Sequence, residues 1–249
     1  MTVGFWQKIV LTIRIAGISL IDAIKVVSAS FLRKDRVSYI HGVIHGWARS
    51  VLSILQVDYK IIDQYDFAFI EHRPYIIMSN HCSHIDIPLI YETFAKDKIG
   101  MISKKEIFNI PIFGRGMRLG GCLSIDRKNM RQAMRDLVIA KDSMLSGMRL
   151  WIAPEGTRSP SGVLGPFKKG GFKIACEVNA IIVPVTIVGS NRVLPAKTLD
   201  YSLGKLVEVY IGKPIDTMNY DVNDLELLMA DTAKEISRRL SGQVSGNLQ

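Results

Sequence analysis

The sequence predicts an α/β fold, with a mainly parallel or mixed central sheet flanked by helices and an N-terminal amphipathic helical segment that associates with a membrane. From residue 57 onward, short apolar runs alternate with helical patterns, which is typical of strands joined by helices. The 249 residues, 48% of them hydrophobic, suffice for one such domain with a full core. Before residue 57, two helical patterns follow each other with no strand between them. We therefore predict a helical segment over 1–56 and an α/β domain over 57–249.

The composition indicates which classes of partner this chain binds. A formal net charge of +9, from 32 basic and 23 acidic residues, favours an anionic membrane, an anionic substrate or nucleic acid. The mean hydropathy of +0.18 is high for a basic protein and favours lipid. Cys82, Cys122 and Cys176 are widely spaced and form no CxxC pair, which argues against a disulfide framework or a zinc knuckle. A reducing, cytosolic environment fits these cysteines.

The first helical pattern covers residues 5–32. Charged residues interrupt it, so no uncharged run approaches the ~20 residues that span a bilayer. At helical spacing, Gln7, Arg14, Asp22 and Lys25 share a narrow sector, and apolar side chains cover the opposite side. This pattern predicts a helix in the membrane interface, and a core helix is the alternative. We expect a peripheral or monotopic protein at the cytoplasmic face of the cell membrane.

The remaining elements follow in order. A second helical pattern runs over 37–56, where apolar residues recur at spacings of four. The predicted strands are 57–62, 74–79, 98–103, 120–125, 149–153, 181–187 and 206–212. The predicted helices are 85–95, 106–117, 129–146, 168–178 and 222–240. Because sites in open sheets gather where strands end, the polar residues after four of these strands are expected to meet in one cleft.

The stretch SNHCSHIDIP, residues 79–88, follows one of these strands and allows three chemistries. A metal site would use His81, His84 and Asp86, but the spacing is not a standard one for zinc and no further ligand accompanies it. A thiol nucleophile would be Cys82, with His84 as the histidine able to face its sulfur. In the third interpretation, Asp86 fixes the tautomer of His81, whose second nitrogen then takes a proton from a hydroxyl of the substrate.

The stretch APEGTRSPSG, residues 153–162, follows another strand and suits a phosphorylated polyol. Arg158 offers a planar fork of donors to a phosphate, Glu155 could accept from a hydroxyl, and Gly156 permits a tight turn. Taken alone, the same residues would also fit a surface turn with a local ion pair.

Four ordered blocks carry a resemblance to a known family. NHCSHID, KKEIFNIPIFG with GGCLSIDR, PEGTRS and IIVPV, spread over about residues 79–186, resemble the blocks of the glycerolipid acyltransferases, with the lysophosphatidic acid acyltransferases as the nearest members. The resemblance implies that His81 is the catalytic base and Asp86 its orienting acid. It further implies that the acceptor is bound by Lys104, Arg127, Glu155, Gly156, Thr157 and Arg158, and that Pro184 lies on the acyl-donor side.

The implied reaction moves a fatty acyl group from acyl-ACP or acyl-CoA to the free hydroxyl of lysophosphatidic acid, giving phosphatidic acid for phospholipid biosynthesis. Both reactants are substrates, so no acyl-enzyme, metal or cofactor is expected. A related enzyme acting on glycerol-3-phosphate or a lyso-ornithine lipid stays open, as does a non-catalytic module that binds anionic membranes. Nucleic acid is not expected, because no aromatic RNA-binding pattern accompanies the basic residues.

Overall fold

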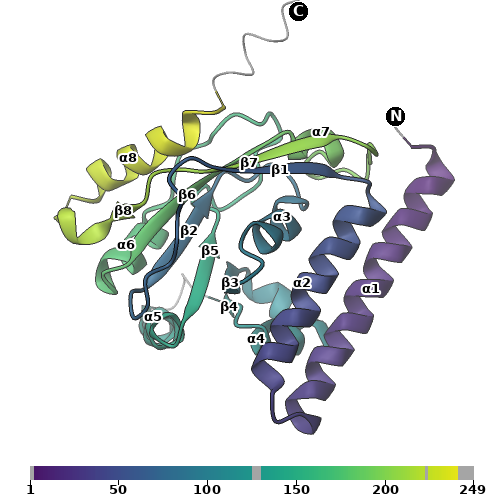
Figure 1. Cartoon of the computed structure of the whole chain (residues 1–249), viewed down its shortest axis with the longest axis horizontal. Coiled ribbons are helices and arrows are strands. Elements are labelled where there is room, and N and C mark those ends of the chain that lie inside the picture. Colours follow the sequence, from purple (N-terminus) through teal and green to yellow (C-terminus); the bar gives the residue numbers. More distant parts are fainter. Residues whose placement is uncertain (1–2, 125–129, 222–223, 241–249) are drawn as a thin grey trace, which may run out of the picture.

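A central sheet organises the molecule in the computed structural model, which describes residues 3–124, 130–221 and 224–240 (Figure 1). Within these ranges, the strand order is β1-β7-β6-β2-β5-β3-β4, with β8 paired to β6. The strands are β1 (Asp58–Asp63), β2 (Tyr75–Ser79), β3 (Lys98–Ser103), β4 (Leu123–Ser124), β5 (Met148–Ile152), β6 (Ile181–Val188), β7 (Leu206–Ile211) and β8 (Ile215–Asp216). Strand β6 runs antiparallel to β7 and β8, and the other pairs are parallel. The predicted mainly parallel or mixed sheet is confirmed.

Helices cover both faces of this sheet. They are α1 (Phe5–Leu32), α2 (Arg36–Ile54), α3 (Asp86–Thr93), α4 (Phe113–Leu119), α5 (Met130–Leu145), α6 (Lys169–Glu177), α7 (Ser190–Val193) and α8 (Leu225–Ser237), with 3-10 turns η1 (Lys105–Asn109) and η2 (Thr217–Asn219). Because side chains alternate along a strand, Ile76 and Met78 of β2 pack with α6 and α8, whereas Tyr75 and Ile77 join the cluster on the opposite face. Both faces of β2 are therefore buried.

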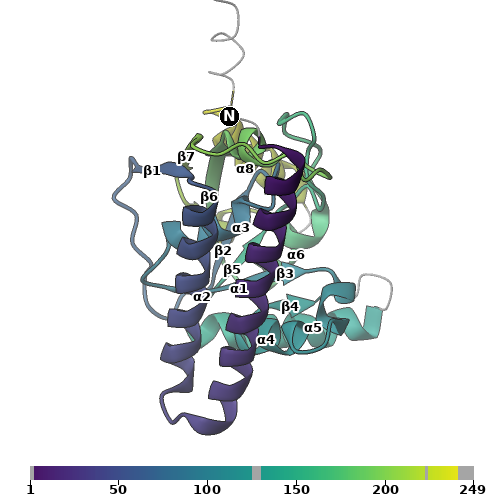
Figure 2. The ribbon, with the colours of Figure 1, turned by 90° about the vertical axis from the view of Figure 1, so that its right-hand side faces the viewer.

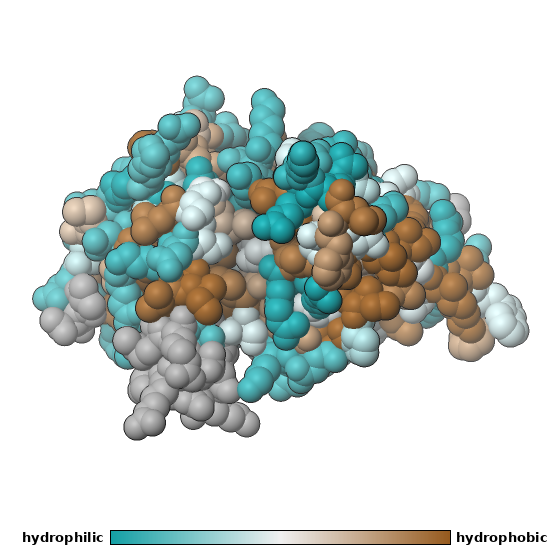
Figure 3. Space-filling model, turned by 90° about the horizontal axis from the view of Figure 1, so that it is seen from below, coloured by the Kyte–Doolittle hydropathy of each residue, from teal (hydrophilic) through white to brown (hydrophobic). Residues whose placement is uncertain are grey.

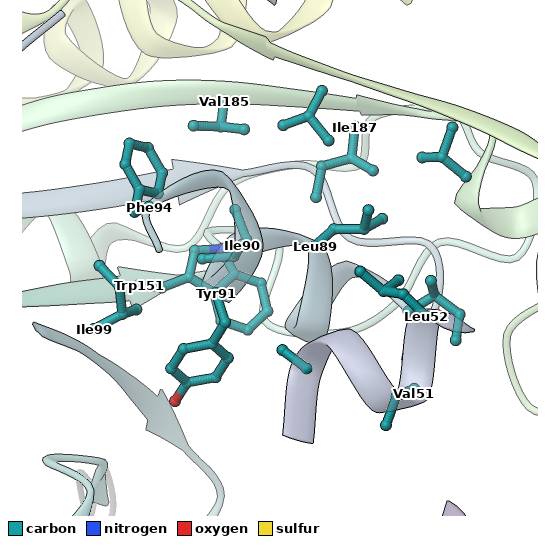
Figure 4. Packing of buried hydrophobic residues seen from close by; sticks show 14 of the residues in the cluster. Val51, Leu52, Leu89, Ile90, Tyr91, Phe94, Ile99, Trp151, Val185 and Ile187 are labelled. Carbon is teal, nitrogen blue, oxygen red and sulfur yellow. The ribbon is translucent and has the colours of Figure 1, made fainter. Parts of the chain in front are cut away.

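The second face carries the helices that position the loop of residues 80–85, between β2 and α3. Figure 4 shows Leu89 of α3 between Ile187 of β6 and Leu52 of α2, and all three are almost fully buried. Burying a side chain of this size stabilises the fold by about 1.5–3 kcal/mol. Helix α3 is thereby held between the sheet and α2, which fixes the loop that precedes it.

Two predicted elements were wrong in extent. The helix expected over 106–117 is broken into η1 and α4 around Pro111, and Ile112 adopts a left-handed backbone with φ +64°. Such a backbone is rare for a β-branched residue, so the break is a strained turn. The strand expected over 120–125 is reduced to β4 in its described part, because Gly120 and Gly121 close a turn with φ +82° at Gly121. The short elements α7, β8 and η2 were not predicted.

Helices α1 and α2 form an antiparallel hairpin on the sheet domain (Figure 2). The inner face of α1 packs on α2 and α4, and a bond from Trp47 Nε1 to Ser19 Oγ of 2.9 Å joins the two long helices. The outer face exposes a row of large apolar side chains: Phe5, Trp6, Val10, Ile13, Leu20, Ile21, Ile24, Phe31 and Leu32. Figure 3 shows hydrophobic residues gathered over this side. None of the described helices is long and apolar enough to cross a bilayer.

Candidate active site

His81 and Asp86 form a hydrogen-bonded pair between the end of β2 and the start of α3. The distance from His81 Nδ1 to Asp86 Oδ2 is 2.8 Å, and the carboxylate is fully buried. The same oxygen accepts the backbone N–H groups of Cys82 at 2.8 Å and Ser83 at 2.9 Å. With Nδ1 donating to this fixed acceptor, Nε2 of the neutral ring carries the lone pair. The arrangement can therefore act as an oriented base.

Two further side chains of this loop, those of Asn80 and Ser83, fasten it to β6 and to the residue after α7. Asn80 bonds both backbone groups of Ile187, as donor and as acceptor, at 2.8 Å each. Ser83 Oγ donates to the carbonyl of Leu194 at 2.7 Å. These neutral bonds connect residues more than a hundred positions apart, so the loop depends on the sheet for its shape.

Trp151 is a neighbour of His81 that the sequence did not indicate. It lies near the end of β5, and its ring meets the His81 imidazole edge-on, with centroids 5.6 Å apart. Trp151 Nε1 also donates to Ser79 Oγ at 2.9 Å. The indole therefore restricts the tilt of the imidazole from the side. An aromatic residue inside an apolar strand carries no catalytic pattern, which is why sequence reasoning missed it.

Glu155 connects the two loops of the site through backbone hydrogen bonds. Its Oε1 accepts from the N–H of His81 at 2.9 Å, and its Oε2 accepts from the N–H of Gly165 at 2.8 Å. The N–H of Ser159 in turn donates to the His81 carbonyl at 2.7 Å. Burial raises the pKa of Glu155, and the two backbone donors oppose that rise. Glu155 thus holds the backbone of His81 in place, a role that the sequence did not predict.

An apolar cavity of about 570 Å³ opens beside this loop. Its wall comes from α1, α2, α3 and α4, and residues around 194–201 complete it. His84 and Arg158 are part of the lining, and His84 lies three residues after His81 in the same loop. Partial burial and then the Arg158 guanidinium lower the pKa of His84. The cavity therefore offers an apolar interior with a cation close to the base.

The other predicted site residues differ in where they lie relative to the cavity. Gly156 adopts φ +73°, which supports the predicted tight turn, and Thr157 beside it is exposed. Lys104 directly follows β3 and is exposed, but it is not among the described residues that line the cavity. Pro184 is buried within β6, opposite Met78 of β2 in the sheet, and is likewise absent from that lining. Arg127 lies outside the described residues. The binding roles of these residues stay predictions.

The two competing interpretations of the opening stretch find no support in the geometry. Cys82 is buried, and burial, followed by the nearby Asp86 carboxylate, raises the pKa of its thiol to about 12. A thiolate nucleophile would therefore be scarce at neutral pH. Within the described part of the chain, no group of three or more His, Cys, Asp or Glu side chains is arranged to hold a metal ion.

The chain is similar to several known acyltransferases. A protein-family model described as Acyltransferase matches residues 62–188. A chloroplast 1-acyl-sn-glycerol-3-phosphate acyltransferase of Brassica napus is 35% identical over 142 residues, which are 57% of this chain and 41% of that protein. The 1-acyl-sn-glycerol-3-phosphate acyltransferase of Saccharomyces cerevisiae is 31% identical over 193 residues, 74% of this chain and 62% of its own. The chain spans about two fifths of the length of the chloroplast relatives it matches.

A solved structure matches nearly the whole fold. The crystal structure of PlsC, the 1-acyl-sn-glycerophosphate acyltransferase of Thermotoga maritima, superposes with a TM-score of 0.77 at 25% identity, over 95% of both chains. The family model covers just over half of the sequence and includes the His81–Asp86 pair and the Glu155–Arg158 turn. This chain therefore belongs to the acyltransferase family.

Proposed function

We propose that this protein transfers a fatty acyl group from an acyl thioester to the free hydroxyl of 1-acylglycerol-3-phosphate, giving phosphatidic acid. The observation that carries the proposal is the His81–Asp86 pair, with its fully buried carboxylate, in a loop whose His84 lines an apolar cavity together with Arg158. An acyl chain suits the apolar interior, and a phosphate monoester suits a guanidinium at its edge. The names of the similar acyltransferases support the same acceptor.

In the proposed reaction, His81 is the general base. Its Nε2 takes the proton of the acceptor hydroxyl while that oxygen attacks the thioester carbonyl carbon. Asp86 stabilises the imidazolium that forms, and the hydrogen bond at Nδ1 keeps the ring oriented. The tetrahedral intermediate then expels the thiolate, which takes the proton back from the imidazolium. The products are an ester and a free thiol, and no acyl-enzyme is formed.

Product analysis tests this proposal directly. The purified protein is supplied with acyl-CoA or acyl-ACP and with lysophosphatidic acid, glycerol-3-phosphate or a lyso-ornithine lipid in separate reactions. We expect mass spectrometry to find phosphatidic acid as the main product with lysophosphatidic acid as acceptor. Preferred acylation of either of the other two acceptors would assign a different substrate, and no transfer with any donor would remove the enzymatic proposal.

The outer face of α1 supports a second part of the proposal, attachment to an anionic membrane at the cytoplasmic face of the cell. Replacing exposed Ile13 and Leu20 together by Glu should weaken sedimentation with anionic liposomes roughly tenfold or more, because each side chain loses apolar contact with lipid. Leu227→Glu, at a similarly exposed position on α8, is the matched control and should leave sedimentation unchanged. Equal losses in both proteins would point to general misfolding instead.

A further inference from the structure

The turn over residues 195–200 borders the cavity and has a constrained backbone. Lys197 adopts φ +64°, a left-handed conformation that is uncommon for a residue with a side chain. The N–H and the hydroxyl of Thr198 both donate to the Pro195 carbonyl, at 3.3 and 3.1 Å. The N–H of Asp200 donates to Thr198 Oγ1 at 3.2 Å. These local bonds hold Lys197 at the tip of a defined turn.

The same turn is fastened to both the catalytic loop and α1. Just before it, the carbonyl of Leu194 accepts from Ser83 Oγ in the loop that carries His81. At its end, Asp200 forms an ion pair with Lys8 of α1, and the Tyr201 hydroxyl lies 3.2 Å from Thr12 Oγ1. The position of Lys197 is therefore set relative to the base, although more than a hundred residues separate the two in the sequence.

Charge is sparse in the wall of the cavity. Among the described residues that line it, Arg158 is the arginine and Lys197 is the lysine. Most of the other lining residues are apolar. The acidic residue Asp22 also lines it, but its carboxylate is paired with Lys25 at 2.7 Å. Two cations in the lining of an otherwise apolar space match an amphiphile that carries an anionic head and a hydrocarbon tail.

We infer that Lys197 is a second cation for the acceptor's phosphate and acts together with Arg158. The inference rests on the proposed function and adds a residue that lies outside the four sequence blocks. A phosphate monoester carries about −1.5 to −2 charge at pH 7, more than one guanidinium neutralises. Arg158 offers a planar fork, and Lys197 offers a point charge on a flexible stem that reaches a further oxygen. Both contacts would hold the glycerol hydroxyl near His81.

Steady-state kinetics with lysophosphatidic acid and an acyl thioester tests the inference. We expect Lys197→Ala to raise the acceptor KM about tenfold, as loss of one charge-assisted contact predicts, and to change the donor KM by less than twofold. In Lys197→Arg, the acceptor KM should stay close to that of the unaltered protein. Lys197→Gly should behave as the Ala variant, because glycine accepts the left-handed backbone but lacks the charge. Lys173→Ala, at an exposed lysine of α6 away from the cavity, is the control.

Each alternative outcome overturns the inference in a recognisable way. An unchanged acceptor KM in Lys197→Ala would remove Lys197 from phosphate binding. A rise in the donor KM instead would assign the lysine to the phosphates of coenzyme A or acyl carrier protein. Normal KM in Lys197→Gly would show that the turn and not the charge matters. Phosphatidic acid formation by the unaltered protein keeps the proposed function in place under all three outcomes, and its absence would reject the proposed function itself.

Discussion

His81→Ala is expected to reduce acyl transfer by roughly 10²- to 10⁴-fold, since general-base catalysis contributes about that much. The variant removes the nitrogen that takes the proton from the acceptor hydroxyl, and the apolar cavity keeps its lining. The fold should survive, because Asp86 still accepts from the N–H groups of Cys82 and Ser83. We therefore expect kcat to fall by this factor, while the temperature of unfolding and the sedimentation with liposomes stay close to those of the unaltered protein.

Two control variants sharpen this result. His72→Asn changes a histidine on an exposed loop with φ +62°, a backbone that asparagine also tolerates, and should keep full activity. Cys82→Ala removes the thiol nucleophile that the sequence offered as an alternative, and turnover should persist because the buried thiol takes no part. Near-normal kcat in His81→Ala would refute the base assignment. Loss of activity in Cys82→Ala, together with an acyl group on the protein by mass spectrometry, would instead revive a covalent mechanism.

The alternation of strands and helices could be predicted from the sequence because the apolar residues of each element follow a simple pattern. Strands β2 and β6 appear as continuous apolar runs, since helices cover both sheet faces, and the predicted bounds agree with the structure to within one residue. The direction of β7 was not readable, because parallel and antiparallel partners of a buried strand can have the same composition. The break at Pro111 and the short β4 depend on local turns that the helical and strand patterns do not encode.

The site was predictable only where reactive residue types cluster along the chain. His81 and Asp86 are five positions apart, so a single bend brings them together, and the structure places them in contact. Trp151 and Lys197 reach the site from distant elements through packing, and neither belongs to a recognisable spacing. Glu155 was noticed for its chemistry, but its bonds to the backbones of His81 and Gly165 depend on how two loops meet.

Substitutions of Asp86 are expected to separate catalysis from folding, because one carboxylate oxygen serves both. Asp86→Asn keeps an oxygen that can accept from His81, Cys82 and Ser83 but loses the charge that stabilises the imidazolium. We expect kcat to fall by roughly 10²- to 10⁴-fold. The temperature of unfolding should fall less than in an Ala variant, since the backbone hydrogen bonds keep an acceptor although the first turn of α3 loses its negative charge.

Asp86→Ala should lose stability as well as activity. The variant leaves the buried N–H groups of Cys82 and Ser83 without their acceptor, and each costs about 1–3 kcal/mol. It also removes the acidic side chain from the first turn of α3, where the helix dipole favours negative charge. The midpoint of thermal unfolding should therefore fall by roughly 5–20 °C, as measured by calorimetry. If both variants melted like the unaltered protein, the carboxylate would not organise the loop. If Asp86→Asn kept normal kcat, its charge would not assist proton transfer, and His81 would have to act without it.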